Sequence, residues 1–134
     1  MNEVNQAIFQ KLQAGTALTA LLAGTASIYH LQPPDNTAMP YVIFNLQGGG
    51  DENQTPSRMK NLVYFIRGYS STSAAAAGSI DAQVDSLFHG GTIGVSGWNP
   101  FWLNREVDLE QIENLPSGEK AYMAGAFYRL RMDK

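Results

Sequence analysis

The sequence has 134 residues, a formal net charge of −3 and no cysteine. This length is typical of one domain of about 100–150 residues, so we expect a single domain over residues 1–134. Hydrophobic residues make up 44% of the chain and charged residues only 16%, which excludes intrinsic disorder, because disorder requires low hydrophobicity and high charge.

The same composition excludes several kinds of site. Without cysteine there is no disulfide framework, thiolate zinc site or cysteine nucleophile. Nine basic against twelve acidic residues give no basic surface for nucleic acid. The polar start does not resemble a signal peptide, and the most apolar window, residues 17–26, is far shorter than a membrane span of about twenty residues. We expect a soluble, cytoplasmic protein without membrane contact, whose low charge suggests that other protein covers part of its surface.

The start of the chain predicts helix and then strand. Apolar residues recur at helical spacing over residues 4–12, and Gly15 follows as a stop signal. After a second, short helical turn, residues 27–31 are mostly β-branched or aromatic and end before Pro33-Pro34. This pattern predicts a short strand at the edge of a sheet.

The middle of the chain predicts a β-hairpin with a long loop. Residues 41–46 and residues 61–69 are rich in β-branched and aromatic side chains, which favours two strands. Residues 48–58 contain three glycines and polar turn formers without periodicity, so we expect a mobile loop there. A phosphate site at these glycines is not favoured, because no Lys-Ser/Thr pair follows and no helix begins there.

The second half predicts a helix and a second hairpin. Residues 73–88 have helical periodicity after a Ser/Thr-rich cap, with Asp81 and Asp85 on the outer side of the helix. Strands over 100–112 and 120–132 flank a turn around 115–118. The order of elements favours the α+β class: a mixed, largely antiparallel sheet of four to five strands packed against two main helices.

No pattern of catalytic or ligating residues emerges. The two histidines, His30 and His89, lack the spacing of metal ligands, and His89 is placed to cap the helix that precedes it. Residues 94–97 lack the G-x-S-x-G spacing of a nucleophile elbow. We therefore expect no enzyme, no cofactor and no metal. The alternative is a small-molecule-binding or hydrolytic α+β domain that uses one of the histidines.

Charges alternate along the two C-terminal strands. Glu106, Asp108 and Glu110 would share one face of a strand, and Arg129 and Arg131 one face of the next. A register that opposes Glu106 to Arg131 and Asp108 to Arg129 would pair acids with bases. Such a face is either solvated and salt-bridged, or it meets a neighbouring subunit or lines a pore.

With this order of predicted helices and strands, the sequence resembles the tail completion, or tail terminator, proteins of long-tailed (siphovirus-type) phages and prophages. The resemblance rests on residues 17–22, Ile28-Tyr29 and residues 39–44, then on residues 63–69 and the Ser71-Thr72-Ser73-Ala74 segment before the Ala-rich helix. The Pro-Tyr-Val-Ile-Phe element and this strand-to-helix junction are its most specific parts, whereas the C-terminal third matches only as a generic hairpin.

The resemblance implies a structural protein of the virion neck, assembled in the host cytoplasm. It implies a homo-oligomer, a hexameric ring that caps the head-proximal end of the tail tube, stops tube polymerisation and joins the tail to the head. Its partners would be the major tail tube protein and a head–tail connector or head-closure protein, while DNA passes through the lumen without specific binding. Another neck component, a head-closure or connector protein, is the alternative.

Two sets of residues are candidates for these contacts. The first is the predicted loop, with Gly48, Gly49, Gly50, Asp51, Glu52, Asn53, Gln54 and Arg58. The second is the charged face, as an interface or as the lining of the lumen, with Glu106, Asp108, Glu110, Arg129 and Arg131.

Overall fold

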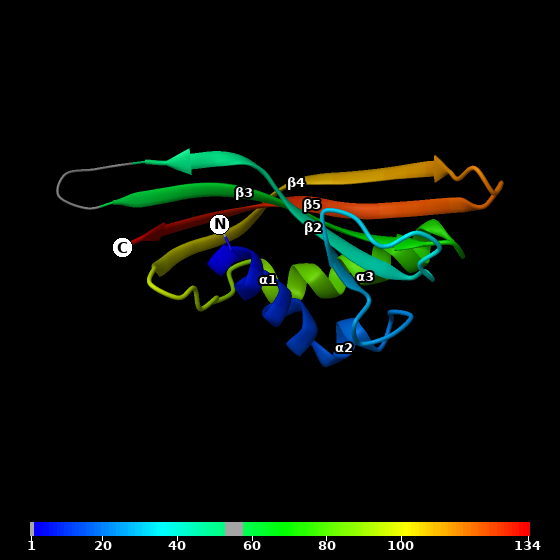
Figure 1. Ribbon diagram of the computed structural model, residues 1–134, viewed down its shortest axis with the longest axis horizontal. Coiled ribbons are helices and arrows are strands. Elements are labelled where there is room, and N and C mark those ends of the chain that lie inside the picture. Colours follow the sequence, from blue (N-terminus) through cyan, green and yellow to red (C-terminus); the bar gives the residue numbers. More distant parts are fainter. Residues whose placement is uncertain (1, 53–57) are drawn as a thin grey trace.

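A five-stranded sheet carries three helices on one of its faces (Figure 1). The computed structural model describes residues 2–52 and 58–134. The elements are α1 (Asn2–Ala14), α2 (Thr16–Thr19), β1 (Ile28–His30), β2 (Tyr41–Asp51), β3 (Met59–Ser70), α3 (Ala74–Phe88), β4 (Asn99–Asn114) and β5 (Lys120–Asp133). The strand order is β1-β2-β3-β5-β4, in which β1 runs parallel to β2 and all other neighbours are antiparallel. The predicted α+β class is confirmed.

Both predicted main helices form, and for the expected local reasons. The stripe over residues 4–12 turns Val4, Ile8 and Leu12 into the core. Helix α3 begins after Ser73, whose hydroxyl accepts a hydrogen bond of 3.1 Å from the backbone N–H of Ala76 and thereby caps the helix. No helix in the described part of the chain is both long and apolar enough to cross a membrane.

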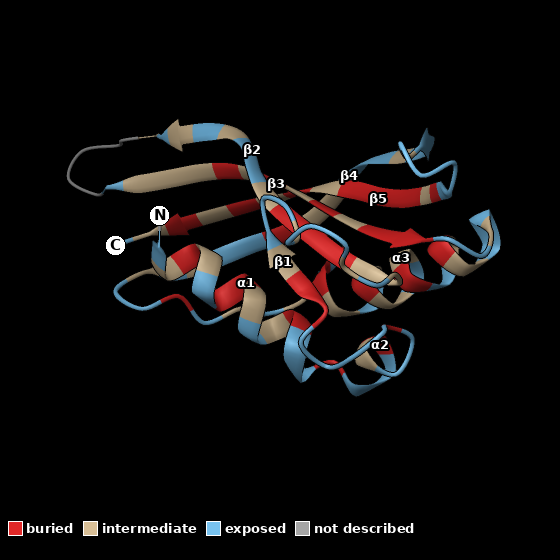
Figure 2. Ribbon diagram, turned by 45° about the vertical axis from the view of Figure 1, so that its right-hand side comes forward, coloured by how far each residue is buried: buried red, intermediate tan, exposed pale blue. Residues whose placement is uncertain are grey.

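The core lies between the helices and the sheet, where buried residues follow one face of β3 and β5 (Figure 2). Tyr64 and Tyr128 are its largest fully buried side chains. Helix α3 approaches β3 closely at Gly68, where a Cβ atom would lie 2.4 Å from Cγ2 of Ile80. The missing side chain therefore allows the helix to pack directly on the strand.

The opposite surface of the sheet, which we call the open face, carries no helix of the described chain (Figure 1). Toward the β4–β5 turn it holds a second, smaller apolar cluster made by Ile43, Tyr69, Ala121 and Met123, with Met39, Tyr41, Phe65 and Leu115 packed against it. The sheet thus has one face covered by helices and one that is available to other molecules.

The two hairpins extend to opposite ends of the sheet. Asp51 pairs with Lys60 at the far end of the β2–β3 hairpin, while Asn114 pairs with Lys120 at the β4–β5 turn. Figure 1 shows these hairpin ends at the left and right of the molecule, with both chain termini on the left.

The predicted loop over residues 48–58 is wrong in its first part. Strand β2 continues through Gly48, Gly49 and Gly50 to Asp51, in register with residues 60–63 of β3. Glycine is depleted in strands, so composition alone indicated a loop. A β-bulge between Leu46 and Gly48 and the backbone ladder to β3 extend the strand nevertheless. Asn53 and Gln54 lie outside the described residues.

Candidate assembly surfaces

Paired charges occupy the end of the β2–β3 hairpin. Asp51 bonds Lys60 (Oδ1–Nζ 2.6 Å) and Arg58 (Oδ2–Nη2 3.3 Å), and these cations lower the pKa of the Asp51 carboxyl. The amide of Asn61 donates a 2.9 Å hydrogen bond to Oε2 of Glu52. These side chains of the predicted interaction loop are therefore held against β3.

The predicted pairing of β4 with β5 is wrong in register. Arg131 lies opposite Trp102 and Arg129 opposite Asn104, whereas Asp108 lies opposite Ala126. The turn at residues 115–119 and two β-bulges, between Pro100 and Trp102 and between Arg105 and Val107, shift the strands relative to the predicted alignment.

The second bulge also separates the three acidic residues. Glu106 points to the open face, where its Oε2 accepts a 2.8 Å hydrogen bond from Nε of Arg129. Asp108 and Glu110 lie opposite Ala126 and Ala124 and share the helix-covered side. The predicted common face of Glu106, Asp108 and Glu110 is therefore wrong, because a bulge interrupts the two-residue repeat of the strand.

A row of polar side chains crosses the open face. Arg129 donates to Oδ1 of Asn61 over 2.6 Å as well as to Glu106, and Arg131 forms a 3.5 Å ion pair with Glu52. The hydrogen bond to Glu106 raises the pKa of the Arg129 guanidinium. Both candidate arginines are consequently neutralised by a nearby carboxylate.

Arg105 forms a charge cluster that the sequence patterns missed. Its guanidinium binds both carboxylate oxygens of Asp81 (3.0 and 2.8 Å), Oδ1 of Asp108 (2.6 Å) and the hydroxyl of Tyr128 (3.1 Å). Asp85 lies 3.7 Å away. These hydrogen bonds, first of all those from Asp81, raise the pKa of Arg105.

The cluster corrects the placement of the two α3 carboxylates. Asp81 and Asp85 face β4, so their predicted position on the outer side of the helix is wrong. Their spacing of one helical turn was the available signal, since residues i and i+4 share a helix face and can bind one cation together. The cluster ties the edge strand β4 to the helical layer.

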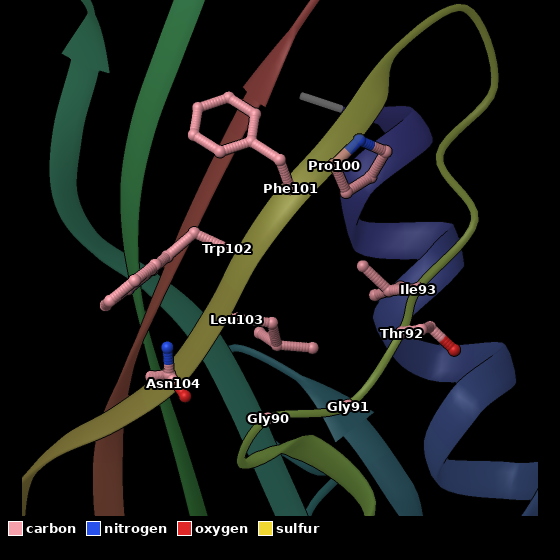
Figure 3. Close-up of a pocket in the computed structure, with 9 residues that line it drawn as sticks. All are labelled: Gly90, Gly91, Thr92, Ile93, Pro100, Phe101, Trp102, Leu103 and Asn104. Carbon is pink, nitrogen blue, oxygen red and sulfur yellow. The ribbon is translucent and has the colours of Figure 1, made fainter.

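The first bulge in β4 presents two aromatic side chains together. Phe101 and Trp102 are consecutive, yet both extend to the same side of the strand, opposite to Leu103 and Ile93 (Figure 3). They are 50% and 46% exposed, and Val107 on the same strand is 45% exposed. The Arg131 guanidinium lies 5.4 Å from the centre of the Phe101 ring. The sequence predicted the strand but not the bulge, so this aromatic pair was missed.

Neither histidine belongs to a cluster of reactive groups. Nδ1 of His89, at the C-terminal cap of α3, accepts a 3.1 Å hydrogen bond from the backbone N–H of Arg105. The ring of His30 lies 5.2 Å from that of Phe44. Within residues 2–52 and 58–134, no group of three His, Cys, Asp or Glu side chains is placed to hold a metal ion.

Two of the comparisons with known proteins found a match. A family model described as "Tail completion protein gp17" matches residues 6–114. The structure is similar to a chain of the "Virion of native gene transfer agent (GTA) particle", with a TM-score of 0.79 and 20% sequence identity over 98% of this chain and 95% of that one. At this identity the likeness shows a shared fold. No curated protein sequence matches the chain.

Proposed function

Because the chain belongs to the tail completion protein gp17 family, structural proteins of the phage tail and not enzymes, we propose that it caps the head-proximal end of the tail tube. In this role it stops tube polymerisation and provides the surface that joins the tail to the head. Its place is the virion tail and neck, in assembly with other virion proteins. In our proposal six copies form a symmetric ring, and residues 1–134 fold as the single domain of each copy. Such a ring requires contacts between unlike surfaces of neighbouring copies.

The exposed strand β4 is the observation that supports this proposal best. This strand of 16 residues lies at the sheet edge and exposes four large apolar side chains, Phe101, Trp102, Val107 and Ile112. Apolar side chains grouped on an exposed surface mark sites of contact with other proteins. An assembly of copies and neck proteins would cover them.

Two separate ends of the molecule suit two different partners. The β2–β3 hairpin, with Asp51, Glu52 and Arg58, and the β4–β5 turn lie at opposite ends of the sheet (Figure 1). In our proposal the first contacts the major tail tube protein and the second the connector or head-closure protein. A ring between tube and head needs this separation, since its two rims bind different proteins.

The charges of the open face are compatible with a DNA passage. Arg129 and Arg131 are paired with Glu106 and Glu52, so the row that crosses the face has little net charge. Strong binding of duplex DNA needs several basic residues that neutralise phosphates. We propose that the duplex moves past this surface without specific binding.

Electron microscopy of particles assembled without this protein tests the role. Tails of abnormal length support tube capping, whereas tails of normal length beside unattached, emptied heads support the alternative of a head-closure or connector protein. Native mass spectrometry of the purified protein over a range of concentrations tests the ring. A six-fold species is expected, and a closed species of another size would contradict the hexamer.

A further inference from the structure

Both sides of the sheet end in a strand whose backbone is partly unpaired. Strand β1 covers only Val42–Phe44 of β2, so in the described chain the backbone of residues 45–51 pairs with β3 alone. On the other side, the backbone of β4 meets Gly90 at Leu103 and His89 at Arg105. Beyond that point, residues 106–114 pair only with β5 among the described residues. We call residues 45–51 and 106–114 the two open edges.

Two glycines in the first open edge have no explanation within the described chain. A Cβ atom at Gly48 or Gly50 would meet nothing within 4 Å, whereas one at Gly49 would collide with Asn61. Glycine weakens a strand, and it often marks a place where another backbone approaches closely. An approaching strand would account for both residues.

A cation on β3 lies beside the first open edge, and acidic side chains lie on the second. In the described chain Arg67 forms no ion pair, and its Nη1 donates a 2.5 Å hydrogen bond to Oδ1 of Asn45, where the first open edge begins. The second open edge holds Glu110 and Glu113, which likewise form no ion pair with a described residue. A cation that reaches the first open edge from β3 could thus meet an acid of the second.

We infer that the two open edges of neighbouring copies pair with each other and join the sheets around the ring, an inference that rests on the proposed ring. Within one sheet β2 and β4 run in opposite directions. The rotation about the ring axis leaves the direction of each strand along that axis unchanged, so β2 of one copy and β4 of the next form an antiparallel pair. A register with Gly48 opposite Gln111 brings Glu113 to the β-bulge between Leu46 and Gly48. Glu113 lies on the open face, as Asn45 does, so it comes near the Asn45 that Arg67 reaches.

The required offset between copies fits the geometry of closed sheets. Within one copy, Gln111 pairs with Met123, Met123 with Tyr69 and Tyr69 with Tyr41, so Gln111 and Tyr41 lie at the same height along the strands. Gly48 pairs with Val63, six residues of β3 away from Tyr69. At ~3.3 Å per residue, a neighbouring copy must therefore shift by about 20 Å along the strands to bring its Gln111 opposite Gly48. Five strands spaced by about 4.8 Å span about 24 Å, and a strand tilt of ~40° over that width produces an offset of about 20 Å.

Cysteine cross-linking tests the pairing, since the chain has no cysteine of its own. Copies with Gly48→Cys are mixed with copies carrying Gln111→Cys, assembled at high concentration and oxidised, so that a disulfide between different variants reports a contact between copies. We expect cross-linked dimers for 48 with 111 and for 50 with 109. Glu110→Cys, on the other face of β4, is the matched control and should not react with Gly48→Cys.

The outcomes separate this inference from the proposed function. Linkage of 50 with 113 instead of 109 indicates a parallel pair and overturns the inference. Six-fold rings without any of these links overturn the edge pairing but leave the ring intact. Absence of oligomers, both free and on isolated tubes, overturns both.

Exchange of charges provides a second test that leaves the backbone unchanged. Arg67→Glu should weaken ring formation up to about fivefold per contact, the upper range for an exposed ion pair, and Glu113→Arg in the same chain should restore it. Thermal melting of each variant checks that the monomer stays folded. Weakening without restoration contradicts the proposed proximity of these two side chains.

Discussion

Arg105 joins strand β4 to the helical layer through a single guanidinium. The group is 18% exposed and binds carboxylates from both α3 and β4. We predict that Arg105→Ala lowers the free energy of unfolding by about 1.5–3 kcal/mol, because it removes charge-assisted hydrogen bonds and leaves Asp81 and Asp85 without their cation. Arg129→Ala, which breaks a more exposed pair with Glu106, should cost roughly 0.2–1 kcal/mol in the same urea titration. Equal losses would contradict the distinction.

We predict that the stability of the folded protein depends on pH through the phenol of Tyr64. Burial, followed by the charge of Glu3, raises the pKa of Tyr64 to about 12, and its hydroxyl donates a 2.7 Å hydrogen bond to Oδ1 of Asn5. A raised pKa favours the neutral phenol in the folded state. Its contribution is therefore complete below the unfolded pKa of about 10 and is lost as the pH rises toward 12.

The variant Tyr64→Phe isolates this contribution. At pH 8 it should be less stable than the parent protein by about 1 kcal/mol, because the hydrogen bond to Asn5 is lost. Thermal unfolding at pH 8, 10 and 11 should show this difference shrinking as the pH rises. A constant difference would contradict the prediction.

At the scale of elements, the three glycines of β2 are not equivalent. Gly49 has a φ of +103°, and a Cβ atom there would lie 2.2 Å from the carbonyl oxygen of Asn61. We predict that Gly49→Ala destabilises the protein by about 1–3 kcal/mol through backbone strain. At Gly50 a Cβ atom would meet nothing within 4 Å. Gly50→Ala should therefore be neutral or stabilise the folded protein by up to about 1 kcal/mol, because alanine lowers the conformational entropy of the unfolded chain. Denaturant unfolding of both variants measures the contrast, and similar values would disprove it.

At the scale of the whole molecule, the exposed aromatic pair on β4 should contribute to assembly and not to folding. We predict that Phe101→Ser together with Trp102→Ser leaves the melting temperature within a few degrees, since both side chains are about half exposed, but weakens ring formation or tube binding at least tenfold. Native mass spectrometry and binding to isolated tubes measure these effects. Leu21→Ser, at a residue that is 40% exposed on the helical side, is the matched control and should assemble normally.

The helices and most strands follow from local sequence patterns. The apolar stripe of α1, the Ser73 cap of α3 and the β-branched run of β2 each specify an element through interactions of near neighbours. The family resemblance was carried in part by the last two of these segments. The segments that failed, the start of the predicted loop and the β4–β5 register, depend on pairing between distant parts of the chain.

The sequence by itself determined the α+β class and the expectation of partners, because periodicity and composition encode which faces are apolar. The family followed from the resemblance of particular segments to tail completion proteins. The tertiary structure alone decided how β4 is presented. Its two bulges bring Phe101 beside Trp102, send Glu106 to the open face and leave Asp108 with Arg105. A bulge is stabilised by the ladder to β5 and by packing on α3, which are contacts between residues remote in sequence. Which side chains the edge strand offers to a partner was therefore settled only when the sheet was assembled.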